Sequence, residues 1–264
     1  MRNLHRYYYK TYFDGADFRP LLDENDATLG DILRKNQTLC SPNLLYKSKK
    51  DENPQISHAF DLQISYPGLV TGVGINHEAK IEGEFKLGVH FDWTYGMPVV
   101  YGSSVKGVLR SAFISKQKNG KIIEYDNYFL KEVTHREWSQ EEIKLLFDAI
   151  FEGKDEKGNN LSIYDRDIFF DAVISKPDSK GRILCSDSIT PHGGETRDNP
   201  LKNPTPLFFL KIASGCKLEF RFKLKPTLIN GDTFNVEQKL SLFKKILTTI
   251  GVGAKTNVGY GQLK

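Results

Sequence analysis

The chain has 264 residues, of which 39% are hydrophobic and 27% are charged, a composition typical of a folded globular protein and not of a disordered one. No segment approaches the roughly 18 consecutive apolar residues of a membrane span, and the basic N-terminus lacks the apolar core of a signal peptide, so we expect a cytoplasmic protein. The net charge of +4 permits an anionic partner without requiring one.

The cysteines and histidines give no sign of a metal site or a bound cofactor. Cys40, Cys185 and Cys216 are far apart and show no C-x-x-C spacing, which argues against a disulfide framework and a zinc site. We expect all three to be buried free thiols. The histidines show no H-E-x-x-H spacing. We therefore predict neither a metal nor a cofactor.

Residues 1–56 are polar and irregular, apart from a short helix expected at 27–35, and we treat them as an N-terminal extension. The remaining residues, 57–264, are expected to form one domain with insertions. Apolar and polar residues alternate from 59 to 66, which predicts a half-buried strand with Tyr66 among its inward residues.

Further elements follow from the same patterns. The helix expected at 139–151 has Ser139 as its cap and acidic residues in its first turn. Ser214-Gly215 is expected to join two strands as a hairpin. Strands are expected at 82–91, 99–101, 122–129, 168–174, 182–186, 207–212, 217–224 and 258–263, and helices also at 103–116 and 236–250.

Residues 187–206 contain four prolines and little periodicity. Long loops of this kind usually bind something, so we expect this one to project toward RNA or a neighbouring subunit; the alternative is a loop folded over the protein's own core. Strands and helices are interspersed along the whole chain, and the hairpins imply antiparallel pairing. The sequence therefore predicts an α+β fold with an antiparallel sheet.

The segment 102–110, Gly-Ser-Ser-Val-Lys-Gly-Val-Leu-Arg, has features of a phosphate site. Ser103 or Ser104 can cap the helix, whose first N–H groups then remain free. Lys106 and Arg110 are four residues apart and share one helix face. Helix-start amides and two cations together suit an anion. The alternative is an ordinary capped helix with a solvated basic face.

The segment 251–261, Gly-Val-Gly-Ala-Lys-Thr-Asn-Val-Gly-Tyr-Gly, is the second candidate. Its glycines allow the backbone to approach a ligand and turn N–H groups toward an anion. Lys255 adds a full charge, and Tyr260 is placed to stack on a base. A purely structural turn is the alternative. The order helix, loop, strand excludes a Walker A loop, which follows a strand and opens a helix. We expect Lys106, Arg110 and Lys255 to converge on one phosphate-binding surface.

Two pairs of residues raise the alternative of catalysis. His90 and Asp92 fall on one face of an expected strand, where they form either an acid–base pair or a simple hydrogen bond. Asp187 and His192 lie at the start of the long loop and either act in catalysis or shape that loop.

The segment 96–110 resembles the Pro-x-Ile-Pro-Gly-Ser-Ser-Leu-Lys-Gly-x-Leu-Arg signature of the RAMP superfamily, with Tyr101 in place of the usual proline. The ending resembles the C-terminal glycine-rich loop of that superfamily. Three blocks between them, 169–172, 187–192 and 203–210, are similar to the pattern of a subunit of the Cmr complex, the type III-B CRISPR effector. The resemblance spans about 57–264, and residues 1–56 match no pattern.

This resemblance implies a ferredoxin-like (RRM-like) core with long insertions. It implies an RNA-binding subunit that assembles beside other Cmr/RAMP subunits, grips the backbone of the CRISPR guide RNA toward its 3′ side and supports target RNA binding. Catalytic residues are not implied here, because target cleavage belongs to a neighbouring subunit; the alternative is a metal-independent endoribonuclease of the same superfamily, acting through His90, Asp92 or His192. The residues expected to bind RNA are Ser103, Ser104, Lys106, Arg110, Gly251, Gly253, Lys255, Thr256, Asn257, Gly259 and Tyr260.

Overall fold

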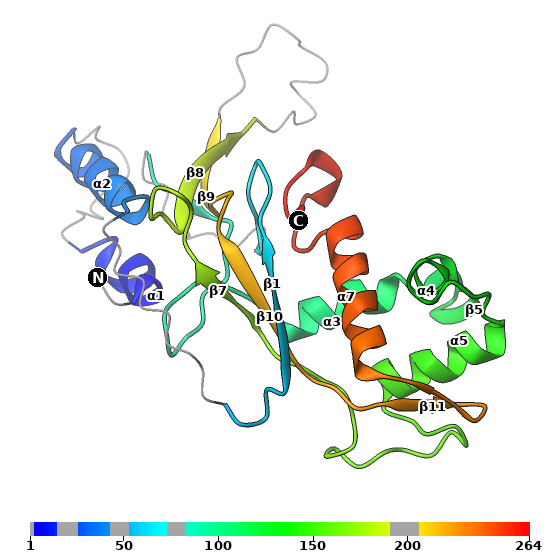
Figure 1. The fold of residues 1–264 in the computed structure, drawn as a ribbon. Coiled ribbons are helices and arrows are strands. Elements are labelled where there is room, and N and C mark those ends of the chain that lie inside the picture. The colour runs from blue at the N-terminus through cyan, green and yellow to red at the C-terminus, as the bar shows by residue number, and fades with distance from the viewer. Residues whose placement is uncertain (1–2, 15–25, 43–52, 73–82, 191–205) are drawn as a thin grey trace, which may run out of the picture.

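The computed structural model describes residues 3–14, 26–42, 53–72, 83–190 and 206–264. It combines antiparallel sheets with helices, as the sequence predicts, and Figure 1 shows most of the helices gathered on one side of a central sheet. Near the N-terminus lie α1 (Leu4–Arg6), the π-helical turn η1 (Tyr7–Thr11) and α2 (Asp26–Leu39).

The central sheet is antiparallel and carries the core. Its strands follow the order β1 (His58–Gln63), β10 (Lys217–Lys223), β7 (Ala172–Lys176) and β3 (Val99–Val100), and β6 (Ile168–Phe169) also pairs with β10. The end of the chain extends this sheet beyond β1, because Leu263 bridges Ile64 and the N–H of Gln63 donates to the carbonyl of Lys264 at 2.8 Å.

A second sheet stands beside the first. β8 (Leu184–Ile189) and β9 (Leu207–Ile212) pair antiparallel, and β2 (Lys86–Leu87) runs parallel to β9. The predicted hairpin of β9 with β10 is therefore wrong. Both edges of β10 are taken by β1 and by β7 with β6, and both edges of β9 by β8 and β2, so the turn at Ser214-Gly215 carries the chain from one sheet to the other.

The helical side contains α3 (Gly102–Ser111), α4 (Tyr128–Thr134), α5 (Gln140–Phe147) with its π-helical extension η2 (Asp148–Glu152), α7 (Val236–Ile250) and the 3-10 turn η3 (Thr256–Val258). Two hairpins accompany them: β4 (Ile114–Lys118) with β5 (Lys121–Tyr125), and β11 (Thr227–Ile229) with β12 (Asp232–Phe234).

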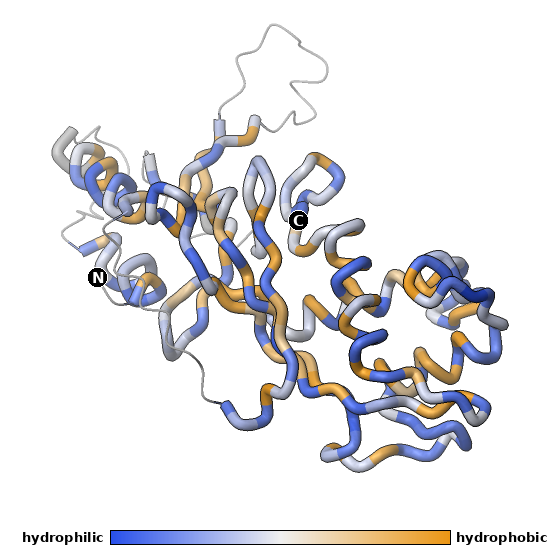
Figure 2. The backbone as a smooth tube through the Cα atoms, in the orientation of Figure 1, coloured by the Kyte–Doolittle hydropathy of each residue, from blue (hydrophilic) through white to orange (hydrophobic). Residues whose placement is uncertain are grey.

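Local sequence signals explain the best-defined helices. Ser139 and Glu142 form a capping box at the start of α5, as predicted from Ser139, and Asn235 does the same with Gln238 for α7. The apolar stripe of α7 packs on the sheet, where the rings of Phe243 and Phe222 lie 5.5 Å apart. Figure 2 shows apolar segments where the sheet and the helices meet.

Several predicted boundaries change. α3 stops at Ser111, because Phe113 is buried and β4 begins at Ile114. The described part of 82–91 contains only the short strand β2, and 258–263 forms isolated contacts instead of a strand. The strand at 59–66 ends early, and Tyr66 is 87% exposed, against the predicted inward position. β8 reaches into the predicted loop 187–206, of which 191–205 lies outside the described residues, including His192.

No helix among the described residues is long and apolar enough to cross a membrane. In the same part of the chain, no three His, Cys, Asp or Glu side chains gather in a way that suits a metal ion. Cys216 is buried as expected, whereas Cys40 and Cys185 are half-buried, and all three are free thiols. Burial raises the pKa of Cys216 to about 12 and that of Cys40 to about 11.

Candidate nucleic-acid interface

The start of α3 is capped from outside the helix. Its N-cap residue is Tyr101, which makes no side-chain cap, so the prediction that Ser103 or Ser104 caps the helix is wrong. Instead, the Gly102 N–H donates to Asp171 Oδ1 at 2.7 Å. Both serines are exposed in the first turn.

Close packing explains why Asp171 takes this position. A side chain on Gly102 would begin 2.2 Å from the carbonyl oxygen of Phe169, so only glycine lets the helix start rest against β6 and the residues after it. The Asp171 carboxylate then complements the positive end of the helix dipole. The carbonyl of Tyr101 accepts from Ser104 and Val105, which leaves the Ser103 N–H as the first-turn donor without an acceptor in the described part of the chain.

Lys106 and Arg110 share one face of α3, as predicted, and both pack against aromatic rings. Lys106 Nζ lies 5.9 Å from the ring centre of Phe169, and the Arg110 guanidinium lies 4.9 Å from that of Phe147. Arg110 also pairs with Glu152 at 3.2 Å. That pair is part-exposed and contributes at most about 1 kcal/mol, so a phosphate can replace Glu152 as the partner of Arg110.

The C-terminal glycine loop, which we define as 251–261, begins where α7 ends. Gly251 is the C-cap residue of α7, and its N–H donates to the carbonyl of Leu247 at 3.0 Å. Lys255 has a left-handed backbone with φ of +59°, and the turn η3 follows it.

The glycines of this loop are required by contacts within the protein. A side chain on Gly253 would begin 2.4 Å from the carbonyl oxygen of Val70, and one on Gly261 would begin 1.9 Å from that of Val252. Both have positive φ, +90° and +71°. A side chain on Gly251 would likewise begin 2.6 Å from the carbonyl oxygen of Gly261. The alternative of a purely structural turn therefore accounts for these three glycines.

The amides of the loop divide into two groups. Inside the protein, the N–H of Val252 donates to Gly261, that of Ala254 to Val70, and those of Val258, Gly259 and Tyr260 to Lys255 or Thr256. The N–H groups of Gly253, Lys255, Thr256 and Asn257 have no acceptor among the described residues. Three of these follow one another, and the Lys255 ammonium beside them forms no ion pair with any described residue. Successive free amides with one cation suit an anion.

Tyr260 does not have the predicted exposed ring. Only 8% of this residue is exposed, and its hydroxyl donates to Asp187 Oδ2 at 2.7 Å. Lys211 pairs with the same carboxylate, and its ammonium lies 5.4 Å from the Tyr260 ring centre. The ring therefore holds the glycine loop against β8 and β9, and the expectation that it stacks on a base is corrected: a buried ring cannot stack without leaving its site.

Asp187 is accordingly a structural residue of this cluster. Burial alone would raise the pKa of its carboxyl, but hydrogen bonds from Lys211 and Tyr260 outweigh burial and hold that pKa below its ordinary value. Asp187 thus stays ionised at neutral pH as the acceptor for both partners.

His90 and Asp92 do not form the predicted pair. The Asp92 carboxylate accepts from the N–H groups of Thr94 and Tyr95, at 2.8 and 2.5 Å, and so closes a turn. The His90 ring stacks on Tyr101 with ring centres 4.9 Å apart, and burial lowers the pKa of His90.

One short segment links the glycine loop to the start of α3. Ala254 bonds to Val70 at 2.7 Å. Two residues later, a side chain on Gly72 would begin 2.8 Å from the ring of His90, which stacks on Tyr101, the N-cap of α3. The sequence does not reveal this link, because neither Val70 nor Gly72 carries a distinctive side chain. The link joins the two motifs through neighbouring contacts, and the convergence of Lys106, Arg110 and Lys255 on one surface stays a prediction.

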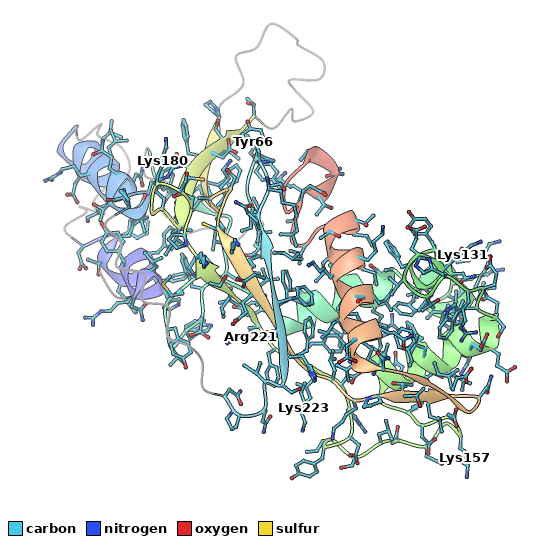
Figure 3. All side chains as sticks on the ribbon, in the orientation of Figure 1. Tyr66, Lys131, Lys157, Lys180, Arg221 and Lys223 are labelled. Carbon is cyan, nitrogen blue, oxygen red and sulfur yellow. The ribbon has the colours of Figure 1, made fainter. Side chains whose placement is uncertain are left out.

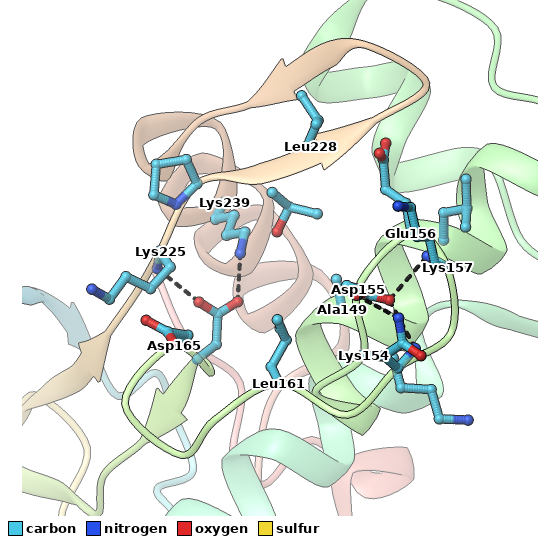
Figure 4. Close-up of a pocket in the computed structure, with 15 residues that line it drawn as sticks. Ala149, Lys154, Asp155, Glu156, Lys157, Leu161, Asp165, Lys225, Leu228 and Lys239 are labelled. Carbon is cyan, nitrogen blue, oxygen red and sulfur yellow. Dashed lines mark hydrogen bonds and ion pairs between the residues drawn. The ribbon is translucent and has the colours of Figure 1, made fainter.

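A cavity of about 540 Å³ lies elsewhere, between the segment 154–167 and the hairpin β11–β12 (Figure 4). At its base Lys239 pairs with Asp167 at 2.5 Å, and both side chains are at most 2% exposed. The lining holds Lys154, Lys157, Lys225 and Lys239 against Asp155, Glu156, Asp165 and Asp167. These four positive and four negative side chains balance, so this cavity does not suit phosphate.

Comparison with known proteins shows the family to which the chain belongs. Residues 61–264 match the family model described as the RAMP superfamily. The chain belongs to the RAMP superfamily. The match includes both α3 and the glycine loop, the two motifs that carry the resemblance.

One curated protein and two solved structures are similar to this chain. The chain is 25% identical over 239 residues to the CRISPR system Cmr subunit Cmr6 of Pyrococcus furiosus, which covers 74% of this chain and 64% of the relative. The chain therefore spans slightly less than two thirds of that curated protein. Among solved structures, it is similar in fold to a chain in the cryo-EM structure of the type III-B Cmr-beta bound to cognate target RNA, with a TM-score of 0.51, 20% identity and coverage of 92% of this chain and 76% of the other. The crystal structure of Cmr6 from Pyrococcus furiosus matches with 23% identity and a TM-score of 0.41, over 78% of this chain and 96% of that one.

Proposed function

We propose that this RAMP protein is a non-catalytic, RNA-binding subunit of a type III-B CRISPR effector ribonucleoprotein. It grips the backbone of the guide RNA toward its 3′ side and supports binding of the target RNA. Its partners are the guide RNA, the target RNA and other Cmr subunits. The likeness to Cmr6 and the fold shared with a chain of an RNA-bound type III-B complex support this proposal.

The observation that carries the proposal is the turn at 255–257. Its three successive N–H groups have no acceptor in the described part of the chain, and the Lys255 ammonium beside them has no ion-pair partner there. Each N–H group can donate to a phosphate oxygen, and such contacts fix the position of a strand without reading its sequence. Lys106 and Arg110 add two further cations that already lie on one helix face.

The central sheet supports a ferredoxin-like core. Along the chain the elements follow the order β1, α3, β7, β10, α7 and the C-terminal residues. In space the C-terminal residues lie next to β1, β1 next to β10, and β10 next to β7. This order supports the split βαβ arrangement of that fold, with β8 and β9 as an insertion between its second and third strands. All of these neighbours are antiparallel.

The geometry of His90 and Asp92 supports a non-catalytic role. A metal-free ribonuclease needs a base near the 2′-hydroxyl and an acid near the leaving oxygen. Here the Asp92 carboxylate closes its own turn, and the His90 ring lies flat on Tyr101. The charged side chains at the proposed RNA contacts are those of Lys106, Arg110 and Lys255, and none of them is a histidine or a carboxylate.

A salt titration of RNA affinity tests the proposal. Removing one phosphate-binding cation flattens the slope of log K against log salt by about 0.7 for a single strand. We expect Lys255→Ala to flatten the slope by about that amount, with nearly the same affinity for unrelated RNA sequences. Lys157→Ala is the matched control, because Lys157 is exposed and lies far from Tyr66 and the glycine loop in Figure 3.

Two outcomes would contradict the proposal. If Lys255→Ala and Lys157→Ala change the slope equally, the glycine loop does not hold a phosphate. If the unaltered protein shows no salt-dependent RNA binding, the proposed function itself fails.

A further inference from the structure

Tyr66 has the most exposed large apolar side chain that the structure describes, with 87% of the residue open to solvent. Single exposed apolar side chains are common, so exposure alone means little. Its position is informative. The alternation that buries Leu62 and Ile64 would turn this ring inward, but β1 ends at Gln63 and the chain turns at Tyr66.

The backbone on either side of Tyr66 is fixed to the end of the glycine loop and to Gln262, the residue after it. The Ser65 N–H donates to the carbonyl of Gln262 at 2.8 Å, and the carbonyl of Gly68 accepts from the Gly261 N–H at 2.8 Å. Between them, Pro67 Cδ lies 3.6 Å from the point where a side chain on Gly259 would begin. Gly259 directly follows η3, so Tyr66 stands beside the turn that offers its amides to phosphate (Figure 3).

The charged and aromatic parts of a single-strand site thus come from two different segments. The turn at 255–257 supplies amides and a cation for the backbone. Tyr260, the aromatic residue within that loop, is buried and committed to Asp187. The exposed ring next to the turn is that of Tyr66. Tyrosine presents a large flat surface at low cost in conformational entropy, because it has only two side-chain torsions.

We infer that Tyr66 is a base-stacking residue: a strand whose phosphate lies on the turn at 255–257 places a neighbouring nucleobase on the Tyr66 ring. This inference rests on the proposed function. It adds a second contact to the site, at which Tyr66 binds a nucleobase. Stacking tolerates any base, because every base has a π-face, which agrees with binding that does not depend on sequence.

RNA binding by Tyr66→Ala and Tyr66→Phe provides the test, with an unstructured RNA and an abasic RNA of equal length as probes. We expect Tyr66→Ala to bind the normal RNA about 5- to 150-fold more weakly, the range that corresponds to about 1–3 kcal/mol per stacked base. Tyr66→Phe should bind within about twofold of the unaltered protein, and the salt slope should not change, because the ring carries no charge. Both variants and the unaltered protein should bind the abasic RNA equally.

Tyr164→Ala is the matched control, because Tyr164 is also highly exposed, at 71%, but lies outside both RNA-binding motifs. Tyr66→Trp gives a second readout, since its added fluorescence should be quenched by the normal RNA and not by the abasic one. A loss below twofold for Tyr66→Ala, or an equal loss on abasic RNA, overturns the inference. Neither result affects the salt titration of the unaltered protein, whose failure would overturn the proposed function instead.

Discussion

The substitution Gly261→Ala should destabilise the protein by about 2–6 kcal/mol. The new methyl group would start 1.9 Å from the carbonyl oxygen of Val252, at a residue with φ of +71°. A left-handed backbone costs a non-glycine residue about 1–3 kcal/mol, and forcing an extra methyl group into a packed site costs about 1–3 kcal/mol more. The atom that the new methyl group meets belongs to the backbone, so it cannot move aside as the end of a flexible side chain would.

Gly120→Ala separates the two contributions. Gly120 has nearly the same φ, +75°, but nothing lies within 4 Å of the new methyl group. We expect it to lose only the backbone contribution, so the two variants should differ by about 1–3 kcal/mol in the free energy of unfolding. Urea unfolding followed by circular dichroism measures both. Equal losses would refute the view that the glycine loop is shaped by contacts within the protein.

The buried polar groups allow three more predictions. Tyr260→Phe should raise the pKa of the Asp187 carboxyl, measured by NMR titration, and cost about 1.5–3 kcal/mol, because the carboxylate loses a charged hydrogen bond; an unmoved pKa would contradict the assigned bond. Lys239→Met should cost about 3–5 kcal/mol in urea unfolding, because it leaves the Asp167 carboxylate buried and unpaired, whereas a loss below about 1 kcal/mol would mean that water reaches that carboxylate. Burial lowers the pKa of His90 in the folded state. The unfolded chain therefore binds the proton first as the pH falls below about 6.5, and the folded state loses stability there. Between about pH 7.5 and 5.5, His90→Gln should lose less stability than the unaltered protein, and parallel curves of unfolding free energy against pH would contradict this.

Local signals in the sequence predicted the elements that depend on local contacts. α7 was expected at 236–250 and spans Val236–Ile250, because Asn235 caps it and Gly251 ends it within a few residues. The capping role of Ser139 was likewise predictable, since its partner Glu142 is three residues away. The α+β class followed from the alternation of such elements.

Errors arose where the partner is distant in the sequence. β9 and β10 look like a hairpin, but each strand pairs with segments that lie elsewhere in the chain. Ser103 looks like a cap, yet the acceptor at the start of α3 is Asp171, which belongs to another segment. In both cases the competing partner has an ordinary local sequence, so no pattern within a window of residues reveals it.

The candidate site was predictable as residue types but not as geometry. The glycine loop and Lys255 stand out in the sequence, and the structure adds which amides remain free. Tyr260 and Tyr66 show the limit, because the aromatic residue inside the motif is buried and the one outside it is exposed. Only the packing of 65–68 against 259–262 reveals that the exposed ring beside the loop is that of Tyr66 and not that of Tyr260.

Photo-crosslinking with an RNA that carries 4-thiouridine, followed by mass spectrometry of the crosslinked peptides, tests the central claim most directly. If the chain holds RNA at the glycine loop, crosslinks should gather in the peptides that contain Tyr66 and residues 255–257, and Lys255→Ala should weaken them. Crosslinks that gather instead on the segment 154–167, and that persist in Lys255→Ala, would contradict the account.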